Sequence, residues 1–203
     1  MKQKSRTEYS VMNTTVAFLA QTLAIFMGFF TRVVFTRTLS EGYVGINGLF
    51  TDILNILSLS ELGVGTAITY ALYAPIARRD IKKQQILMRM FRNFYRITAG
   101  FVLLAGLCLI PFLDILMKDR PDVNHLIIIY LLYLLNSVVS YLLIYKKTLV
   151  DAHQMNYITV MYHNGFLVLQ DILQIMVLFL TRNFILFLVI AVVCTIIGNI
   201  CMS

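Results

Sequence analysis

Polar side chains recur at helical spacing inside four long apolar stretches of this sequence. Residues three, four, seven or eleven positions apart lie on one face of a helix. Each stretch has a polar seam of this kind: Thr14, Gln21, Gly28 and Arg32; Asn47, Thr51, Asn55, Ser58 and Thr69; Tyr133, Asn136, Ser137 and Ser140; and His163, Gln170 and Gln174. The seams favour a shared hydrated cavity, with hydrogen bonding between helices as the alternative. We expect a polar substrate to contact the seam amides Asn47, Asn55, Asn136, Gln170 and Gln174.

Three carboxyl groups and one arginine lie in the same apolar stretches. A charge at the centre of a bilayer costs at least about 2.5–3.5 kcal/mol, so such groups usually mark a functional site. Asp52, Glu61 and Asp171 are candidates for ion or proton coupling, and the alternative is a buried, hydrogen-bonding carboxyl group. Arg32 is either a cavity cation that attracts an anionic substrate or a side chain that reaches the outer headgroups.

No pattern in the sequence is typical of catalysis. It has no nucleophile–base–acid set and no glycine-rich phosphate loop. Cys108, Cys194 and Cys201 lack the paired spacing of a zinc site. We therefore expect no enzymatic activity, no cofactor and no bound metal.

Composition identifies the elements that hold these residues. Hydrophobic residues make up 59% of the chain and charged residues 13%, whereas a soluble domain averages about 45–50% and about 25%. A membrane-spanning helix needs about 20 mostly apolar residues. The sequence therefore predicts an all-α membrane protein with a single lobe over 1–203. Its six predicted transmembrane helices are 11–35, 44–72, 97–117, 123–145, 157–180 and 184–201.

The basic residues predict the orientation of these spans. The net charge is +7, but the basic residues lie between apolar spans, which argues against nucleic-acid binding. Alternate connections contain most of the lysines and arginines, and such connections face the cytoplasm. We therefore expect both ends of the chain in the cytoplasm. The residues on the predicted cytoplasmic side are Lys2, Lys4, Arg6, Arg78, Arg79, Lys82, Lys83, Arg89, Arg92, Arg96, Lys146 and Lys147.

The longest connection, 73–96, has the pattern of an amphipathic helix. Its basic side contains Lys82, Arg89, Arg92 and Arg96, and its apolar side contains Leu87, Met90, Phe91 and Phe94. This pattern predicts a helix at the membrane surface that leads into the third span. Two interpretations stay open: an anchor on anionic lipids of the cytoplasmic leaflet, or a surface that receives a phosphate-bearing substrate.

Residues 30–80 contain four motifs in a characteristic order. They are R-x-x-F-x-R-x-L, G-Y-x-G-I-x-G-L-F, S-E-L-G-x-G-x-A and A-L-Y-x-P-I-A-R-R-D. This stretch resembles the N-terminal region of bacterial polysaccharide-biosynthesis flippases of the Wzx type. These proteins belong to the multidrug/oligosaccharidyl-lipid/polysaccharide exporter superfamily.

The resemblance implies a MATE-like transporter of the bacterial cytoplasmic membrane. Its members move undecaprenyl-diphosphate-linked oligosaccharides by alternating access, between two six-helix lobes that enclose a cationic cavity. By resemblance Arg32 and Arg37 contact the diphosphate, and Asp52, Glu61 and Asp171 couple ions. A complete member needs about twice as many helices, so we expect a partial chain, partnered by a C-terminal half or a second copy. The alternatives are a cation-coupled multidrug antiporter and a non-transporting membrane scaffold subunit.

Overall fold

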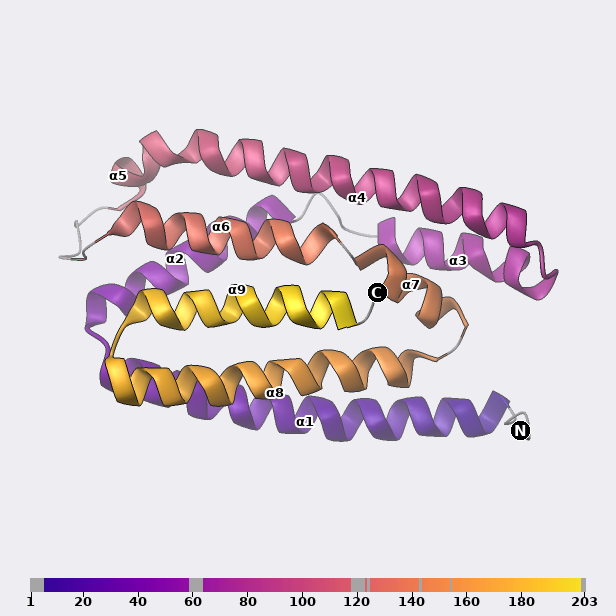
Figure 1. Ribbon diagram of the computed structural model, residues 1–203, viewed down its shortest axis with the longest axis horizontal. Coiled ribbons are helices and arrows are strands. Elements are labelled where there is room, and N and C mark those ends of the chain that lie inside the picture. The colour runs from indigo at the N-terminus through magenta and orange to yellow at the C-terminus, as the bar shows by residue number, and fades with distance from the viewer. Residues whose placement is uncertain are drawn as a thin grey trace.

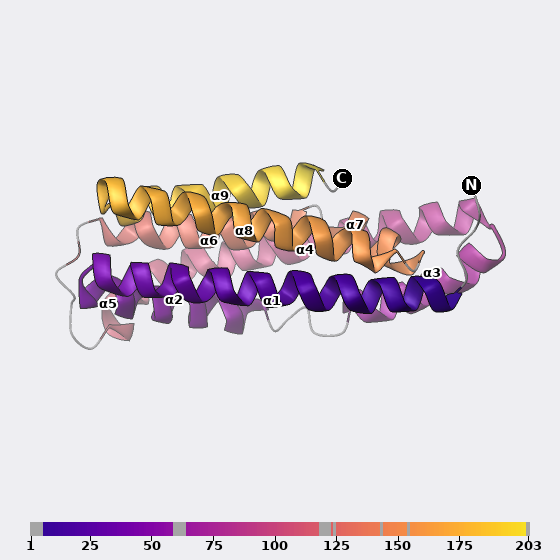
Figure 2. The ribbon, with the colours of Figure 1, turned by 90° about the horizontal axis from the view of Figure 1, so that it is seen from below.

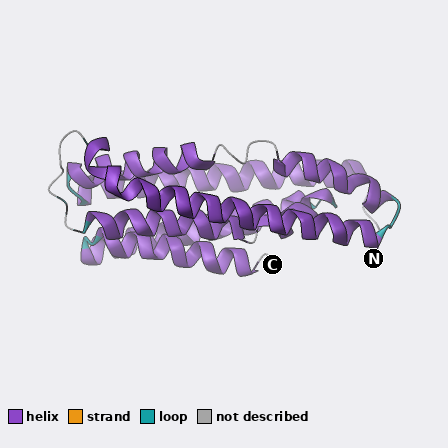
Figure 3. Ribbon diagram, turned by 90° about the horizontal axis from the view of Figure 1, so that it is seen from above, coloured by secondary structure: helices purple, strands orange, loops and turns teal. Residues whose placement is uncertain are grey.

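The chain folds into helices that run back and forth along one long axis (Figures 1 and 2). The computed structural model describes residues 6–58, 64–117, 123, 125–142, 144–153 and 155–201. Over these residues the regular structure is helical throughout (Figure 3). The elements are α1 (Arg6–Thr38), α2 (Glu41–Ser58), α3 (Val64–Ala77), α4 (Ile81–Leu109), a 3₁₀ turn (Ile110–Phe112), α5 (Leu113–Leu116), α6 (Leu126–Leu142), α7 (Ile144–Ala152), α8 (Asn156–Thr181) and α9 (Phe184–Cys201).

The described residues include four helices that are long and apolar enough to cross a membrane. They are Asn13–Thr38, Ile81–Phe112, Asn156–Thr181 and Phe184–Cys201. A fifth candidate is α6 together with α7, as one bent span. These helices bear out the all-α, multi-pass membrane architecture and match the predicted first, third, fifth and sixth spans. The predicted second span is occupied by α2 and α3, between which 59–63 are not described, so the count of six stays a prediction.

The predicted amphipathic segment 73–96 is not a single helix. Its first residues belong to α3, and a turn at Arg78–Asp80 separates them from α4. In this turn Arg79 has a φ of 54°, and the Asp80 carboxylate accepts a hydrogen bond of 3.1 Å from the backbone N of Lys83. Such a cap satisfies a backbone donor that the first turn of a helix leaves free. From Ile81 onward the basic residues and the predicted third span form one continuous helix.

Aromatic rings pack together at the end of the bundle where α1 joins α2 and α8 joins α9, on the left in Figure 1. The Phe184 ring centroid lies 5.5 Å from that of Phe35 and 5.2 Å from that of Tyr43. Phe184 also contacts Tyr133 and Phe187. These rings connect α1, α2, α6 and α9. Since aromatic side chains bury the most apolar area per residue, this cluster fixes one end of the bundle.

Helix α1 packs along α8, α9 packs on both α6 and α8, and α4 packs on α3 and α6. Much of the apolar surface is left uncovered. Phe18, Phe26 and Phe29 of α1 are all at least 60% exposed. Exposed phenylalanines in such numbers on one helix fit contact with lipid.

Candidate functional site

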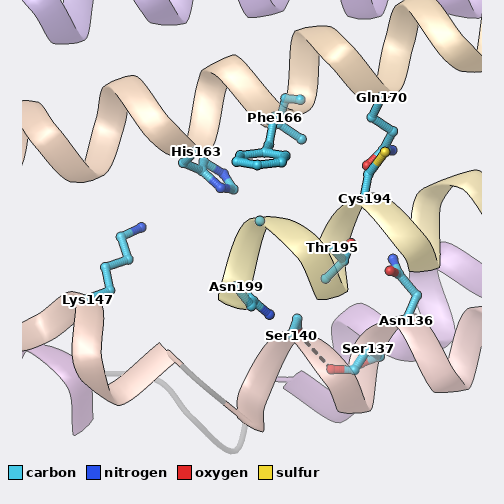
Figure 4. Close-up of a pocket in the computed structure, with 12 residues that line it drawn as sticks. Asn136, Ser137, Ser140, Lys147, His163, Phe166, Gln170, Cys194, Thr195 and Asn199 are labelled. Carbon is cyan, nitrogen blue, oxygen red and sulfur yellow. Dashed lines mark hydrogen bonds between the residues drawn. The ribbon is translucent and has the colours of Figure 1, made fainter. Parts of the chain in front are cut away.

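A cavity of about 250 Å³ lies between α6, α8 and α9, with α7 at one end (Figure 4). Each of these helices contributes side chains at helical spacing, so one face of each helix borders the cavity. The lining residues are Asn136, Ser137, Ser140, Lys147, His163, Phe166, Leu167, Gln170, Cys194, Thr195, Gly198 and Asn199.

Two of the four predicted polar seams meet in this cavity. The seam of the predicted fourth span provides Asn136, Ser137 and Ser140, and that of the fifth provides His163 and Gln170. The cavity thus brings together two of the predicted substrate-binding amides, Asn136 and Gln170. Sequence reasoning missed Lys147 and the whole contribution of α9. The signal in α9 was weak but present, since Cys194, Thr195, Gly198 and Asn199 follow the same helical spacing.

Among the described residues that line the cavity, one buried acceptor has no hydrogen-bond partner. Asn199 Nδ2 on α9 donates to the Val139 carbonyl oxygen on α6 over 3.1 Å, and Ser140 Oγ donates to the Ser137 carbonyl oxygen over 2.6 Å. Asn136 Oδ1, in contrast, is buried and has no hydrogen-bond partner among the described residues. An unsatisfied buried polar group costs about 1–3 kcal/mol. Asn136 therefore holds an unsatisfied acceptor in the wall of the cavity.

Among the described residues that line the cavity, Lys147 is the one lysine or arginine, and none is an aspartate or glutamate. Figure 4 shows Lys147 extending from α7 toward α8, on the side where His163 lies. Asp151, one turn farther along α7, interacts electrostatically with Lys147. The lining therefore favours neutral, hydroxyl-rich or anionic groups over cations.

Helices α8 and α9 approach closely beside the cavity at Gly198. A Cβ atom at this position would lie 3.2 Å from Cγ of Phe166. That distance is tighter than most packed contacts, so a side chain here would push the Phe166 ring. Gly198 therefore helps to set the width of the cavity.

Three other predicted site residues hold helices together. The Asn47 side-chain oxygen accepts a hydrogen bond from the Tyr133 hydroxyl, which joins α2 to α6. Gln174 is 2% exposed, and its Nε2 donates to the Phe187 carbonyl oxygen over 3.0 Å. Asp171 Oδ1 lies 3.0 Å from Thr31 Oγ1, which joins α8 to α1. For these residues the geometry matches the alternative of hydrogen bonding between helices.

Arg32, Arg37, Asp52 and Asn55 are exposed on α1 and α2. The Arg32 guanidinium carbon lies 5.9 Å from the centroid of the Phe35 ring, within the range of a cation–π contact. Glu61, the remaining candidate for ion coupling, lies outside the described residues. The seams of α1 and α2 therefore do not line the cavity between α6, α8 and α9. Helix α1 packs mainly on α8 and meets α2 only briefly, so these exposed groups have no facing helix in the described chain.

The chain matches no protein-family model, no curated protein and no solved structure.

Proposed function

We propose that this chain is one lobe of a membrane transporter that moves undecaprenyl-diphosphate-linked oligosaccharides across the bacterial cytoplasmic membrane by alternating access. The proposal rests on the resemblance of residues 30–80 to Wzx-type flippases and on one structural observation. Charged and polar side chains on α1 and α2 are exposed inside otherwise apolar helices.

The exposed polar face of α1 and α2 carries the proposal. It is defined by Arg32, Thr51, Asp52 and Asn55, and Arg37 is exposed in the last turn of α1, about 140° around the helix from Arg32. In lipid a charge near the bilayer centre, such as that of Asp52, would cost at least about 2.5–3.5 kcal/mol. A second lobe, which is either a C-terminal half or a second copy, would enclose water against this face and remove that cost. The enclosed space is the proposed path of the substrate.

The course of the chain supports a six-pass, MATE-like lobe with its N-terminus in the cytoplasm. In Figure 1 the start of α1, the α3–α4 turn and the α7–α8 connection lie at the same end of the bundle. That end contains Arg78, Arg79, Lys82 and Lys83, and an excess of basic residues marks a cytoplasmic end. In this arrangement α2 and α3 together form one interrupted pass.

Under this proposal the two polar regions have different roles. Arg32 and Arg37 are exposed and contact the diphosphate. A guanidinium group suits this role because it donates two parallel hydrogen bonds to the oxygens of one phosphate. The cavity beside Asn136 and Gln170 accommodates one polar group, such as a sugar, since its volume of about 250 Å³ is too small for a whole lipid-linked oligosaccharide. Asp52, Asp171 and Glu61 remain the candidates for ion coupling.

A transport assay with matched charge changes tests the proposal. The natural gene product is placed in membrane vesicles, and flipping of a fluorescent lipid-diphosphate oligosaccharide is measured. We expect Arg32→Gln with Arg37→Gln to slow flipping by about tenfold or more, since hydrogen bonds to charged groups contribute about 1.5–3 kcal/mol. Arg78→Gln with Arg79→Gln removes the same charge from the exposed α3–α4 turn and is expected to leave the rate within about twofold. Equal rates in the two double variants would contradict the assignment.

A cation-coupled multidrug antiporter of the same superfamily is the second candidate. The half-buried carboxyl group of Asp171, held against Thr31 between α1 and α8, favours it because a carboxyl group in this setting can exchange ions. This candidate predicts that the protein lowers the accumulation of cationic dyes in cells. The flippase proposal predicts no such change.

A further inference from the structure

Helix α4 is longer than a membrane requires. The continuous stretch Ile81–Phe112 has 32 residues, about 48 Å at 1.5 Å per residue, whereas the hydrocarbon core is about 30 Å thick. The apolar residues occupy its C-terminal part, so the first turns lie beyond the hydrocarbon. Residues 81–109 contain no acidic side chain and five basic ones: Lys82, Lys83, Arg89, Arg92 and Arg96.

Within this extension Gln85, Met88, Arg89 and Arg92 line an open notch. Arg89 and Arg92 lie one helical turn apart and point to the same side. Arg92 Nε is shielded from solvent and has no hydrogen-bond partner in the described part of the chain. A charged donor that is shielded from water and has no acceptor lowers the stability of the folded protein. Phosphate is the anion that best fits a pair of guanidinium groups such as Arg89 and Arg92, because its oxygens match the fork of each group.

An apolar stripe runs from the level of the notch into the membrane. It consists of Ile86, Met90, Ile97, Phe101 and Leu104, whose exposed fractions lie between 56% and 72%. The spacing of three, four and seven residues places them in one line, about a third of a turn around the helix from the arginines. A molecule that has both a phosphate and apolar chains can contact both features at once.

We propose that the notch at Arg89 and Arg92 binds the phosphate of an anionic phospholipid, whose acyl chains lie along the apolar stripe. The notch lies on the N-terminal side of the apolar stretch of α4, at the basic end of the bundle. The lipid therefore belongs to the leaflet at that end. The site does not depend on the transported substrate, and it differs from a diffuse attraction between basic residues and anionic lipid. The latter would depend on net charge alone.

Native mass spectrometry of the full chain in detergent, with phosphatidylglycerol added, tests the site. We expect Arg89→Gln with Arg92→Gln to weaken lipid binding by about tenfold, the effect of losing charge-assisted hydrogen bonds to phosphate. Lys82→Gln with Lys83→Gln is the matched control. It removes the same charge from the same helix about 12 Å away, beyond the screening length of about 8–10 Å in salt, and should change binding less than about twofold. Equal losses in both double variants, or no loss in the arginine variant, would overturn the proposal.

The double variant Arg89→Lys with Arg92→Lys separates charge from geometry. Lysine retains the charge but lacks the planar fork, so we expect binding between that of the wild type and the glutamine variant. If the glutamine variant fails to insert into membranes, lipid binding by the lysine variant alone tests whether the site needs the guanidinium groups. Wild-type binding in the lysine variant would contradict the site. Binding of phosphatidylcholine as tight as that of phosphatidylglycerol would contradict its preference for an anionic lipid.

Discussion

At the residue scale, two asparagines of the same cavity have opposite hydrogen-bond states. Asn199 joins α9 to α6 through the Val139 carbonyl oxygen, whereas Asn136 Oδ1 is buried without a partner. Asn199 contributes to helix packing, whereas Asn136 keeps an acceptor that no protein group satisfies. A cost in stability at a binding position is common in proteins.

This contrast predicts changes of opposite sign at the two positions. Asn136→Leu removes the unpaired buried acceptor and should raise the free energy of unfolding by about 1 kcal/mol. Asn199→Leu removes a hydrogen bond between helices and should lower it by about 0.6–1.7 kcal/mol. Thermal unfolding in detergent measures both. Destabilisation by Asn136→Leu to the same extent as by Asn199→Leu would mean that Asn136 is satisfied within the protein.

At the element scale, small residues and polar contacts determine how the helices meet. A Cβ atom at Gly106 of α4 would lie 2.3 Å from Cδ1 of Leu134 on α6. The Tyr130 hydroxyl also donates to the Gly106 carbonyl oxygen over 2.8 Å. The contact between α4 and α6 therefore depends on the missing side chain at this position.

Gly106→Ala should push α4 and α6 apart and destabilise the protein by about 1–3 kcal/mol, the usual cost of overpacking. Gly100→Ala is the control on the same helix, because no atom lies within 4 Å of the added Cβ. We expect a lower midpoint of thermal unfolding for the first variant alone. Equal midpoints for both variants would argue against close packing of α4 on α6.

The Thr31–Asp171 contact gives a second prediction at this scale, because α1 packs mainly on α8. Thr31→Val should destabilise the pair by about 0.6 kcal/mol and at most by about 1.7 kcal/mol, the range for hydrogen bonds between membrane helices. In the control, Thr22→Val, the hydroxyl bonds only the Phe18 carbonyl oxygen of its own helix. Unfolding by denaturing detergent measures the difference, and no difference would remove Thr31 from the interface.

Sequence reasoning predicted the helices better than their contacts. The length of the apolar runs was enough to locate α1, α4, α8 and α9, because a span must satisfy its own backbone hydrogen bonds. Helical spacing also showed which polar residues share a face. It could not show which neighbour that face meets, so Asn47 and Gln174 were assigned to a cavity although they bond other helices.

At the scale of the whole molecule, the chain presents two kinds of surface. Apolar side chains cover the outer faces of α1 and α4, while Arg32, Asp52 and Asn55 form part of an exposed polar face on α1 and α2. Lipid can solvate the apolar surface without cost, whereas charged and polar side chains facing lipid are costly. The account therefore depends on water, and not lipid, next to the polar face.

Cysteine labelling in intact membranes tests this claim most directly. In a chain whose native Cys108, Cys194 and Cys201 are replaced by serine, Asn55→Cys is treated with a membrane-impermeant thiol reagent. Leu104→Cys, on the exposed apolar stripe of α4, is the control. We predict that Asn55→Cys reacts and that Leu104→Cys does not. If Asn55→Cys stays as unreactive as Leu104→Cys from both sides of the membrane, the polar face contacts lipid or protein and the proposed substrate path does not exist.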